Sequence, residues 1–346
     1  MAKIPFVREM EFEYGAVDRV APNLRLVIAE NPSKFTYRGT GTYVVGDGEV
    51  AVIDPGPDRP EHLEALLTAL EGETVSHILV THTHRDHSPL SRRLRDETGA
   101  PVWGCAPHDP HEGWPDDPDA DALTDDEEDA ADGASADGAS AASGEGVADG
   151  EGEGDGEGDE ANTERGFDAD HVPDRQLSHG DVVEGSGWRM EAVHTPGHTS
   201  NHLCFALDDG TLFTGDHVMG WSTSVISPPD GDMQSYLGSL RLLLDRDDRV
   251  YRPTHGPPIT DPVAHVEAFL VHRLEREHDI VELLGTSGPS TIADLVPTLY
   301  ADVDTKLHKA AGRSVHSHLL RLHGAGAVDA EGDPRLLSLA VWRVAR

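Results

Sequence analysis

Three histidines and one aspartate lie within the eight-residue stretch THTHRDHS, at positions 81–88. The stretch directly follows HILV at 77–80, an apolar run that predicts a short buried strand. Residues two apart on a strand point to the same side, so His82 and His84 can address one ion. Asp86 and His87 follow in the next turn and can address a second point. The chain must therefore fold so that a rigid strand end lies beside a metal-binding pocket.

Three more potential ligands follow strand-like segments later in the chain. They are His198 in TPGHTSNH, Asp216 in LFTGDH and His255 in RPTHGPP. We expect two ligand triads, bridged by Asp216, because one carboxylate can offer an oxygen to each ion. The predicted triads are His82, His84 and His198 for one ion, and Asp86, His87 and His255 for the other. Imidazole and carboxylate without thiolate suit Zn²⁺, with Mn²⁺ or Fe²⁺ as alternatives.

Two such ions sharing one water would lower its pKa from 15.7 to about 7 and supply hydroxide at neutral pH. Asp86 is the predicted catalytic residue, because it is both a ligand and a neighbour of that water. Three histidines beside the ligands, His194, His202 and His217, are interpreted as hydrogen-bonding or packing residues. Asp54, in VIDPG, is interpreted as a turn residue.

The first hundred residues alternate between strand and helix patterns, which predicts an α/β fold. The pattern stops at residues 109–170, where 24 acidic residues accompany a single arginine. Such a stretch has too few apolar residues to offset its conformational entropy, so we predict a disordered acidic insert. Strand and helix patterns return after it. We expect a catalytic domain over 1–262, interrupted by this insert.

From residue 263 the chain predicts three helices and a terminal hairpin, a winged-helix-like domain over 263–346. Thr291 and Asp294 have the spacing of a capping box. Such a domain binds nucleic acid, forms a dimer or positions substrate. We expect its histidines on the surface, at positions 265, 272, 278, 308, 316, 318 and 323. Its basic residues could form a local patch for phosphate: Arg273, Arg276, Lys306, Lys309, Arg313 and Arg321.

The formal charge of −37 makes this a strongly acidic protein, and its acidic excess extends outside the insert. Lysine is nearly absent, so we interpret the chain as halophilic, because concentrated salt screens the self-repulsion of such a surface. The rival interpretation is a mesophilic protein with one acidic insert. Two cysteines are too few for a disulfide framework. No segment has the length and hydropathy of a signal peptide or membrane span, so we expect a cytoplasmic protein without a membrane partner.

The ordered set of ligand motifs resembles the metallo-β-lactamase-fold hydrolases over residues 15–108 and 171–262. The resemblance implies a four-layered αββα sandwich with a dinuclear metal site at one edge. The segment PPDGDMQSYLGSL, the helix containing HRLERE and the winged-helix tail resemble the branch typified by β-lactamase-like protein 2. The acidic insert and Asn201, where relatives often have glycine, depart from the pattern.

The resemblance implies a metal-dependent hydrolase, and members of that branch include endoribonucleases that act on single-stranded RNA. A thioester hydrolase of glyoxalase II type would use the same ligands. A protein of another class, a metal-sensing regulator that binds nucleic acid through its winged helix, is a further alternative. The expected substrate is therefore a small-molecule ester or thioester, or single-stranded RNA.

Overall fold

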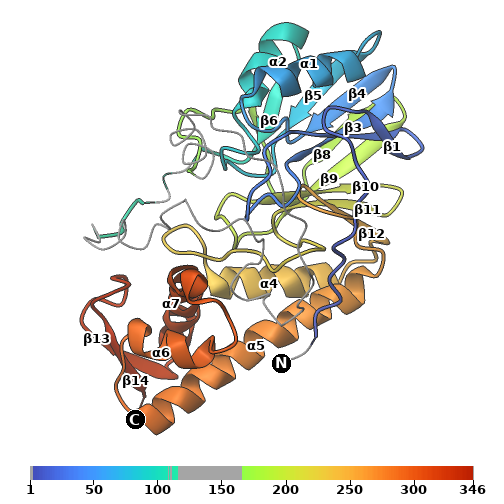
Figure 1. Ribbon diagram of the computed structural model, residues 1–346. Coiled ribbons are helices and arrows are strands. Elements are labelled where there is room, and N and C mark those ends of the chain that lie inside the picture. Colours follow the sequence, from blue (N-terminus) through green and yellow to red (C-terminus); the bar gives the residue numbers. More distant parts are fainter. Residues whose placement is uncertain (1–2, 108, 110, 116–165, 346) are drawn as a thin grey trace, which may run out of the picture.

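The computed structural model describes residues 3–107, 109, 111–115 and 166–345. Figure 1 shows two stacked sheets with helices on both outer sides, and a smaller domain at the carboxyl end. The layers are a helix pair, a seven-stranded sheet, a five-stranded sheet and a second helix pair. The α/β fold with four layers, expected from the resemblance, is confirmed.

The first sheet runs in the order β1-β2-β3-β4-β5-β6-β7. Its strands are β1 (Asp18–Ala21), β2 (Leu24–Ile28), β3 (Gly41–Asp47), β4 (Glu49–Ile53), β5 (Thr74–Leu79), β6 (Val102–Gly104) and β7 (Arg175–Gln176). Side chains alternate between its faces, as the pleat requires. On β2, Leu26 packs against the second sheet, whereas Val27 packs toward the outer helices α1 (Pro60–Ala69) and α2 (Leu90–Thr98).

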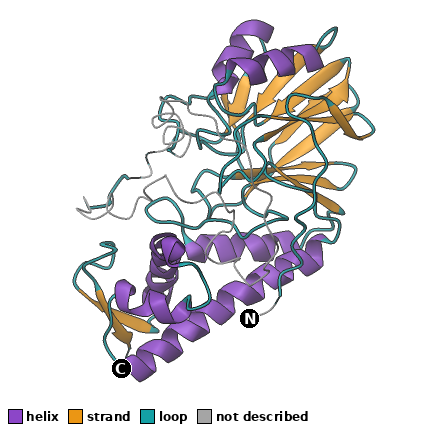
Figure 2. Cartoon of the chain, viewed as in Figure 1, coloured by secondary structure: helices purple, strands orange, loops and turns teal. Residues whose placement is uncertain are grey.

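The second sheet runs in the order β12-β11-β10-β9-β8. Its strands are β8 (Val182–Gly185), β9 (Trp188–His194), β10 (Leu203–Leu207), β11 (Thr211–Gly215) and β12 (Val250–Pro253). Its outer face is covered by α4 (Met233–Leu244) and the first half of the long helix α5 (Pro262–Ser287). Figure 2 shows α4 beside this sheet and α5 running from it toward the carboxyl-terminal domain.

The carboxyl-terminal domain is a winged helix. It contains α6 (Ile292–Leu299), the 3-10 helix η3 (Thr305–Leu307), α7 (His308–Gly324), β13 (Val328–Glu331) and β14 (Val341–Val344). The predicted capping box is present, because the Thr291 and Asp294 side chains each accept a hydrogen bond from the other's backbone N–H. Among the described residues, no helix combines the length and apolarity needed to cross a membrane.

Helix α5 contributes to the cores of both domains. Val266 and Phe269, near its start, pack with α4 and the second sheet. Ile280 and Leu284, near its end, pack with α6 and α7. The predicted division between residues 262 and 263 therefore falls at the first turn of a helix that both cores share.

Several tail side chains expected on the surface are buried instead. The buried histidines are His265, His272, His316 and His318. Arg273 and Arg276, expected in a basic surface patch, are also buried, and Arg321 forms an ion pair with Glu277. The prediction was wrong for α5 because this helix packs against the cores of two domains, and wrong for His316 and His318 because they lie on the buried side of α7.

The acidic insert predicted over 109–170 lies largely outside the described residues, which resume at 166. The boundary at 170 is wrong, because residues 166–168 are folded against the stretch 81–88. Phe167 forms an isolated β-bridge with His84, and the backbone N–H of Asp168 donates to the Thr83 carbonyl at 2.6 Å. The Asp168 carboxylate accepts from the Ser88 hydroxyl at 2.8 Å. A single buried carboxylate in an acidic stretch carries no periodic signal.

Candidate metal centre

The seven predicted ligands come from four segments that begin where strands end. The segment after β5 carries His82, His84, Asp86 and His87, and the segments after β9, β11 and β12 carry His198, Asp216 and His255. The structure brings all seven together in three overlapping groups, within each of which the donor atoms lie within 4.8 Å of one another. The groups are His82–His84–His198, His82–His87–Asp216 and Asp86–His87–His255.

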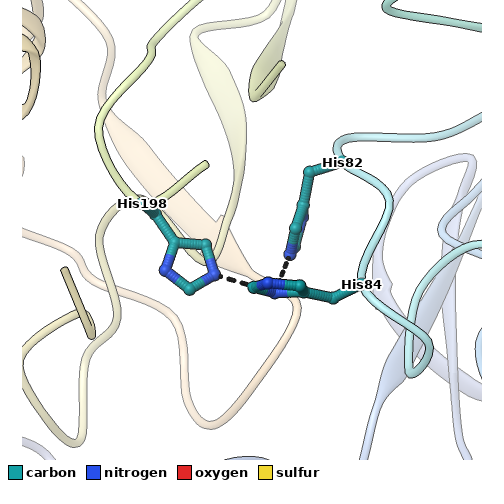
Figure 3. A group of neighbouring side chains, drawn as sticks. All are labelled: His82, His84 and His198. Atoms are coloured by element: carbon teal, nitrogen blue, oxygen red, sulfur yellow. Dashed lines mark hydrogen bonds between the residues drawn. The ribbon is translucent and has the colours of Figure 1, made fainter. Parts of the chain in front are cut away.

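The first group is a triad of imidazole nitrogens (Figure 3). His82 Nε2 lies 2.9 Å from His84 Nδ1, and His198 Nε2 lies 3.1 Å from the same atom. Figure 3 shows the His82 and His198 rings approaching His84 from two different segments. Three ring nitrogens converging on one point is the arrangement that a nitrogen-rich metal site requires.

The triad of Asp86, His87 and His255 lies beside the triad of His82, His84 and His198, because His82 and His87 both belong to the group that includes Asp216. His255 Nε2 lies 3.0 Å from Asp86 Oδ2, and His87 Nε2 lies 3.5 Å from the same oxygen. Asp216 stands between these two triads, because its Oδ2 lies 3.7 Å from His198 Nε2 and its Oδ1 lies 3.4 Å from His255 Nε2. The carboxylate of Asp216 can therefore reach both triads with different oxygens.

Three buried atoms of this cluster lack a hydrogen-bond partner in the described structure: His87 Nε2, Asp216 Oδ1 and His255 Nε2. A buried polar atom without a partner costs about 1–3 kcal/mol. The three lie close together, because His255 Nε2 is 3.4 Å from Asp216 Oδ1 and His87 Nε2 is 3.6 Å from Asp216 Oδ2. A divalent cation there would satisfy them together, so the side chains present fit a metal.

Asp54 lies beneath the site and fixes the orientation of two ligands. Its buried carboxylate accepts from the Thr81 backbone N–H, the Thr81 hydroxyl, the Thr254 hydroxyl and His87 Nδ1, all at 2.8–2.9 Å. A carboxylate only accepts, so His87 carries its proton on Nδ1 and presents the Nε2 lone pair to the site. The Thr81 hydroxyl donates its proton to Asp54, so it can only accept a hydrogen bond from His82 Nδ1, at 3.0 Å.

Backbone carbonyls fix two other ligands in the same way. His255 Nδ1 donates to the Gly39 carbonyl at 3.2 Å, and His198 Nδ1 donates to the Val225 carbonyl at 2.6 Å. In each ring the Nε2 lone pair is then directed at the site. Hydrogen bonds of this kind hold ring orientation and raise the basicity of metal-bound histidines.

The pKa shifts differ between the two halves of the cluster. Burial lowers the pKa of His84 from 6.5 to about 4, and burial also holds the pKa of His82 well below 6.5. These rings are neutral at pH 7, the state that binds metal. Burial acts in the same direction on His87 and His255, but attraction to the nearby aspartates outweighs it and raises both pKa values. The second half of the cluster therefore attracts positive charge.

The three histidines predicted to support the ligands, His194, His202 and His217, belong to none of these ligand groups. His202 Nδ1 contacts the Thr195 hydroxyl at 2.9 Å, and its Nε2 accepts the Asp216 backbone N–H at 3.2 Å, so it supports a ligand as expected. His194 contacts the Ser200 carbonyl at 3.0 Å. His217 is buried against the Tyr236 ring, at 4.9 Å between ring centroids.

Sequence reasoning missed three supporting residues. Asp54 was interpreted as a turn residue, and it does have a positive φ of 48° at a turn, yet its carboxylate also holds Thr81 and His87. Asn201 was noted only as a departure from glycine. Its amide donates to the Thr83 hydroxyl at 3.0 Å and so joins the segment of His198 to that of His82. Asp168 lay inside the predicted insert. Only the position of Asp54 at a strand end signalled such a role.

Family models match both parts of the chain. The model described as metallo-beta-lactamase superfamily matches residues 37–255, and the beta-lactamase associated winged helix domain matches residues 291–340. The beta-lactamase-like protein 2 homolog of Drosophila melanogaster is 27% identical over 322 residues, covering 90% of this chain and 91% of that protein. An atrochrysone carboxyl ACP thioesterase of Claviceps purpurea is 25% identical over 305 residues, covering 84% of this chain and 76% of that protein.

Two solved structures share the fold along almost the whole chain. A metallo-beta-lactamase family protein from Thermus thermophilus superposes with a TM-score of 0.65 at 24% identity, covering 94% of this chain and 100% of that one. A beta-lactamase domain protein from Burkholderia ambifaria gives a TM-score of 0.70 at 20% identity, covering 99% of this chain and 97% of that one. At these identities the likeness is one of fold.

Proposed function

Because this chain belongs to the metallo-β-lactamase superfamily and is a metal-dependent hydrolase, we propose that it cleaves acyl thioesters with two divalent ions. The observation that carries the proposal is the pair of adjoining donor triads with the Asp216 carboxylate between them. Each triad gathers three donor atoms within 4.8 Å of one another, so each triad can hold one ion.

One ion is proposed at His82, His84 and His198, and the other at Asp86, His87 and His255, with Asp216 contributing to both. Zn²⁺ is the proposed ion, because nitrogen donors outnumber carboxylates and no thiolate is present, and the same donors accept Mn²⁺ or Fe²⁺. Two divalent ions held here would lower the pKa of water to about 7 and polarise the scissile carbonyl.

The remaining chemistry belongs to the chain's own residues. Asp86 is proposed to orient the attacking water and to hold its proton on a carboxylate oxygen. Its side chain is 12% exposed, whereas the His87 and His255 side chains are fully buried, so Asp86 has the better access to solvent. The proton can then pass from Asp86 Oδ to the leaving thiolate, which departs as a thiol.

The choice of thioester over RNA follows from charge and from the relatives. Arg273 and Arg276 are buried, and Arg321 pairs with Glu277, which removes half of the expected basic patch of the winged helix. RNA binding depends on such a patch to neutralise phosphates. Two relatives that match more than four fifths of this chain bear the name atrochrysone carboxyl ACP thioesterase.

The test offers lactoylglutathione, a short acyl-coenzyme A and single-stranded RNA to the same purified protein, with and without chelator. We expect metal-dependent release of thiol and no change in RNA length. The Asp216→Ala variant, prepared in parallel, serves as the control for contaminating hydrolases. RNA cleavage by the wild type with thioesters untouched would establish the endoribonuclease alternative, and sequence-specific DNA binding without turnover would establish the regulator.

A further inference from the structure

Helix α5 carries two buried arginines one turn apart, and they reach different parts of the molecule. Arg273 is 1% exposed and its Nη2 donates to the Ser224 carbonyl at 2.6 Å. Arg276 is 3% exposed and its Nη1 donates to the Leu299 carbonyl at 2.9 Å. Its guanidinium also lies over the Tyr300 ring, 4.2 Å from the centroid. Arg276 therefore joins α5 to α6, whereas Arg273 points toward the catalytic domain.

The segment that Arg273 holds also holds a ligand of the candidate metal centre. Ser224 is followed by Val225, whose carbonyl accepts the His198 Nδ1 proton at 2.6 Å. The Ser224 hydroxyl donates to the His217 carbonyl at 2.7 Å, which closes the segment on itself. The planar peptide between Ser224 and Val225 ties the Val225 Cα to the anchored Ser224 carbonyl, so only the φ and ψ of Val225 separate this anchor from the carbonyl that His198 uses.

A second contact supports the same arrangement. Arg273 lies over the Tyr236 ring, with 5.6 Å between its guanidinium carbon and the ring centroid. Tyr236 donates through its hydroxyl to the His217 carbonyl at 3.1 Å. The backbone of Tyr236 also packs so closely on Gly197, the neighbour of His198, that a Cβ there would lie 2.4 Å from Tyr236 Cα. The Arg273 guanidinium therefore contacts both Ser224 and Tyr236, the two residues whose neighbours hold His198 in place.

We propose that Arg273 is a positioning residue for His198, so that the helix connecting the two domains completes the His82–His84–His198 triad. A charged donor at 2.6 Å makes a strong hydrogen bond, and a buried guanidinium cannot move into water without large cost. The proposal rests on the proposed metal site. It predicts that a substitution in α5 lowers the affinity for one ion and leaves the affinity for the other unchanged. Helix α5 lies outside residues 37–255, which the metallo-beta-lactamase superfamily model matches.

The test titrates metal-free protein with Co²⁺, whose visible spectrum separates the three-histidine site of His82, His84 and His198 from the site of Asp86, His87 and His255, which has fewer nitrogen donors. Wild type is expected to bind two ions. Arg273→Met is expected to bind the ion at Asp86, His87 and His255 normally and the ion at the three-histidine site about 10-fold more weakly, the effect typical of lost support to a metal ligand. Arg273→Lys keeps the charge without the planar guanidinium fork and is expected to lie between them.

Arg276→Met is the matched control, because it removes an equally buried arginine from the same helix and should leave both affinities at the wild-type value. Two results would overturn the proposal: unchanged affinities in Arg273→Met, or the same loss in Arg276→Met, which would indicate general destabilisation. If Arg273→Met does not fold, Arg273→Lys against Arg276→Lys decides on the same criterion. Wild-type protein that binds no Co²⁺ would instead refute the proposed metal site itself.

Discussion

Replacing Asp54 by asparagine should weaken metal binding at both triads by about 10- to 100-fold, or roughly 1.4–2.7 kcal/mol. The magnitude follows from what the carboxylate does. Oδ2 accepts three hydrogen bonds, from Thr81, His87 and Thr254, and Oδ1 accepts a fourth from the Thr81 backbone. Asparagine offers a single oxygen and an NH₂ group that can only donate.

Neither orientation of the asparagine amide satisfies these partners. With nitrogen in place of Oδ2, the amide faces the Nδ1 proton of His87, and the ring must move that proton to Nε2, where it blocks the metal. With nitrogen in place of Oδ1, the amide opposes the Thr81 backbone N–H, which then stays buried without an acceptor. Both outcomes also cost stability, at about 1–3 kcal/mol for a buried group without a partner.

The assay is competition between the protein and a chelator of known affinity, with elemental analysis of the bound metal. Asp248→Asn is the control, because Asp248 is a largely buried carboxylate that accepts two hydrogen bonds from Arg246 and lies outside the metal cluster. It should lose stability and keep its metals. If Asp54→Asn retains wild-type affinity, the role assigned to Asp54 is wrong.

Four further outcomes are expected. Asp216→Ala should abolish hydrolysis and reduce bound metal below two equivalents, measured by thiol release and elemental analysis; full activity would exclude a bridging role. Gly197→Ala should lower the affinity for the ion at His198, because Gly197 has a φ of +144° and the added Cβ would clash with Tyr236. A Co²⁺ titration identical to that of wild type would contradict this. Burial lowers the pKa of His62 to about 4, so its neutral form stabilises the fold at pH 7 and this stabilisation falls as the pH drops below 6.5. Between about pH 6.5 and pH 5 the free energy of unfolding should fall by roughly 1.5 kcal/mol more in wild type than in His62→Gln, and parallel urea-unfolding profiles would refute it. Unfolding should require more denaturant in molar KCl than in dilute buffer, and identical curves would contradict a halophilic protein.

Local pattern accounts for the parts of this protein that were predictable from sequence. The apolar run at 77–80 corresponds to the end of β5, and the alternating strand and helix patterns of the first hundred residues correspond to β3, β4, α1 and β5. The capping box at Thr291 and Asp294 was visible for the same reason, since its partners are three residues apart. Potential ligands at strand ends were recognisable because few other roles require histidine and aspartate in that order.

Contacts between distant segments were beyond the reach of local pattern. Asp54 meets Thr254 across 200 positions, and Arg273 reaches Ser224 from a helix that reads as an ordinary amphipathic run. Asp168 is one carboxylate among many in an acidic stretch, and only its place against Ser88 distinguishes it.

Local sequence patterns were sufficient to predict the strands and helices near the site, the ligand types and the order in which the ligands occur. The tertiary structure alone decided which histidine nitrogen faces the site, which carboxylate lies beneath it and which arginines are withdrawn from solvent. The physical reason is that periodicity and capping act over a few residues, whereas hydrogen-bond partners and burial are set by segments that meet only after the two sheets have packed.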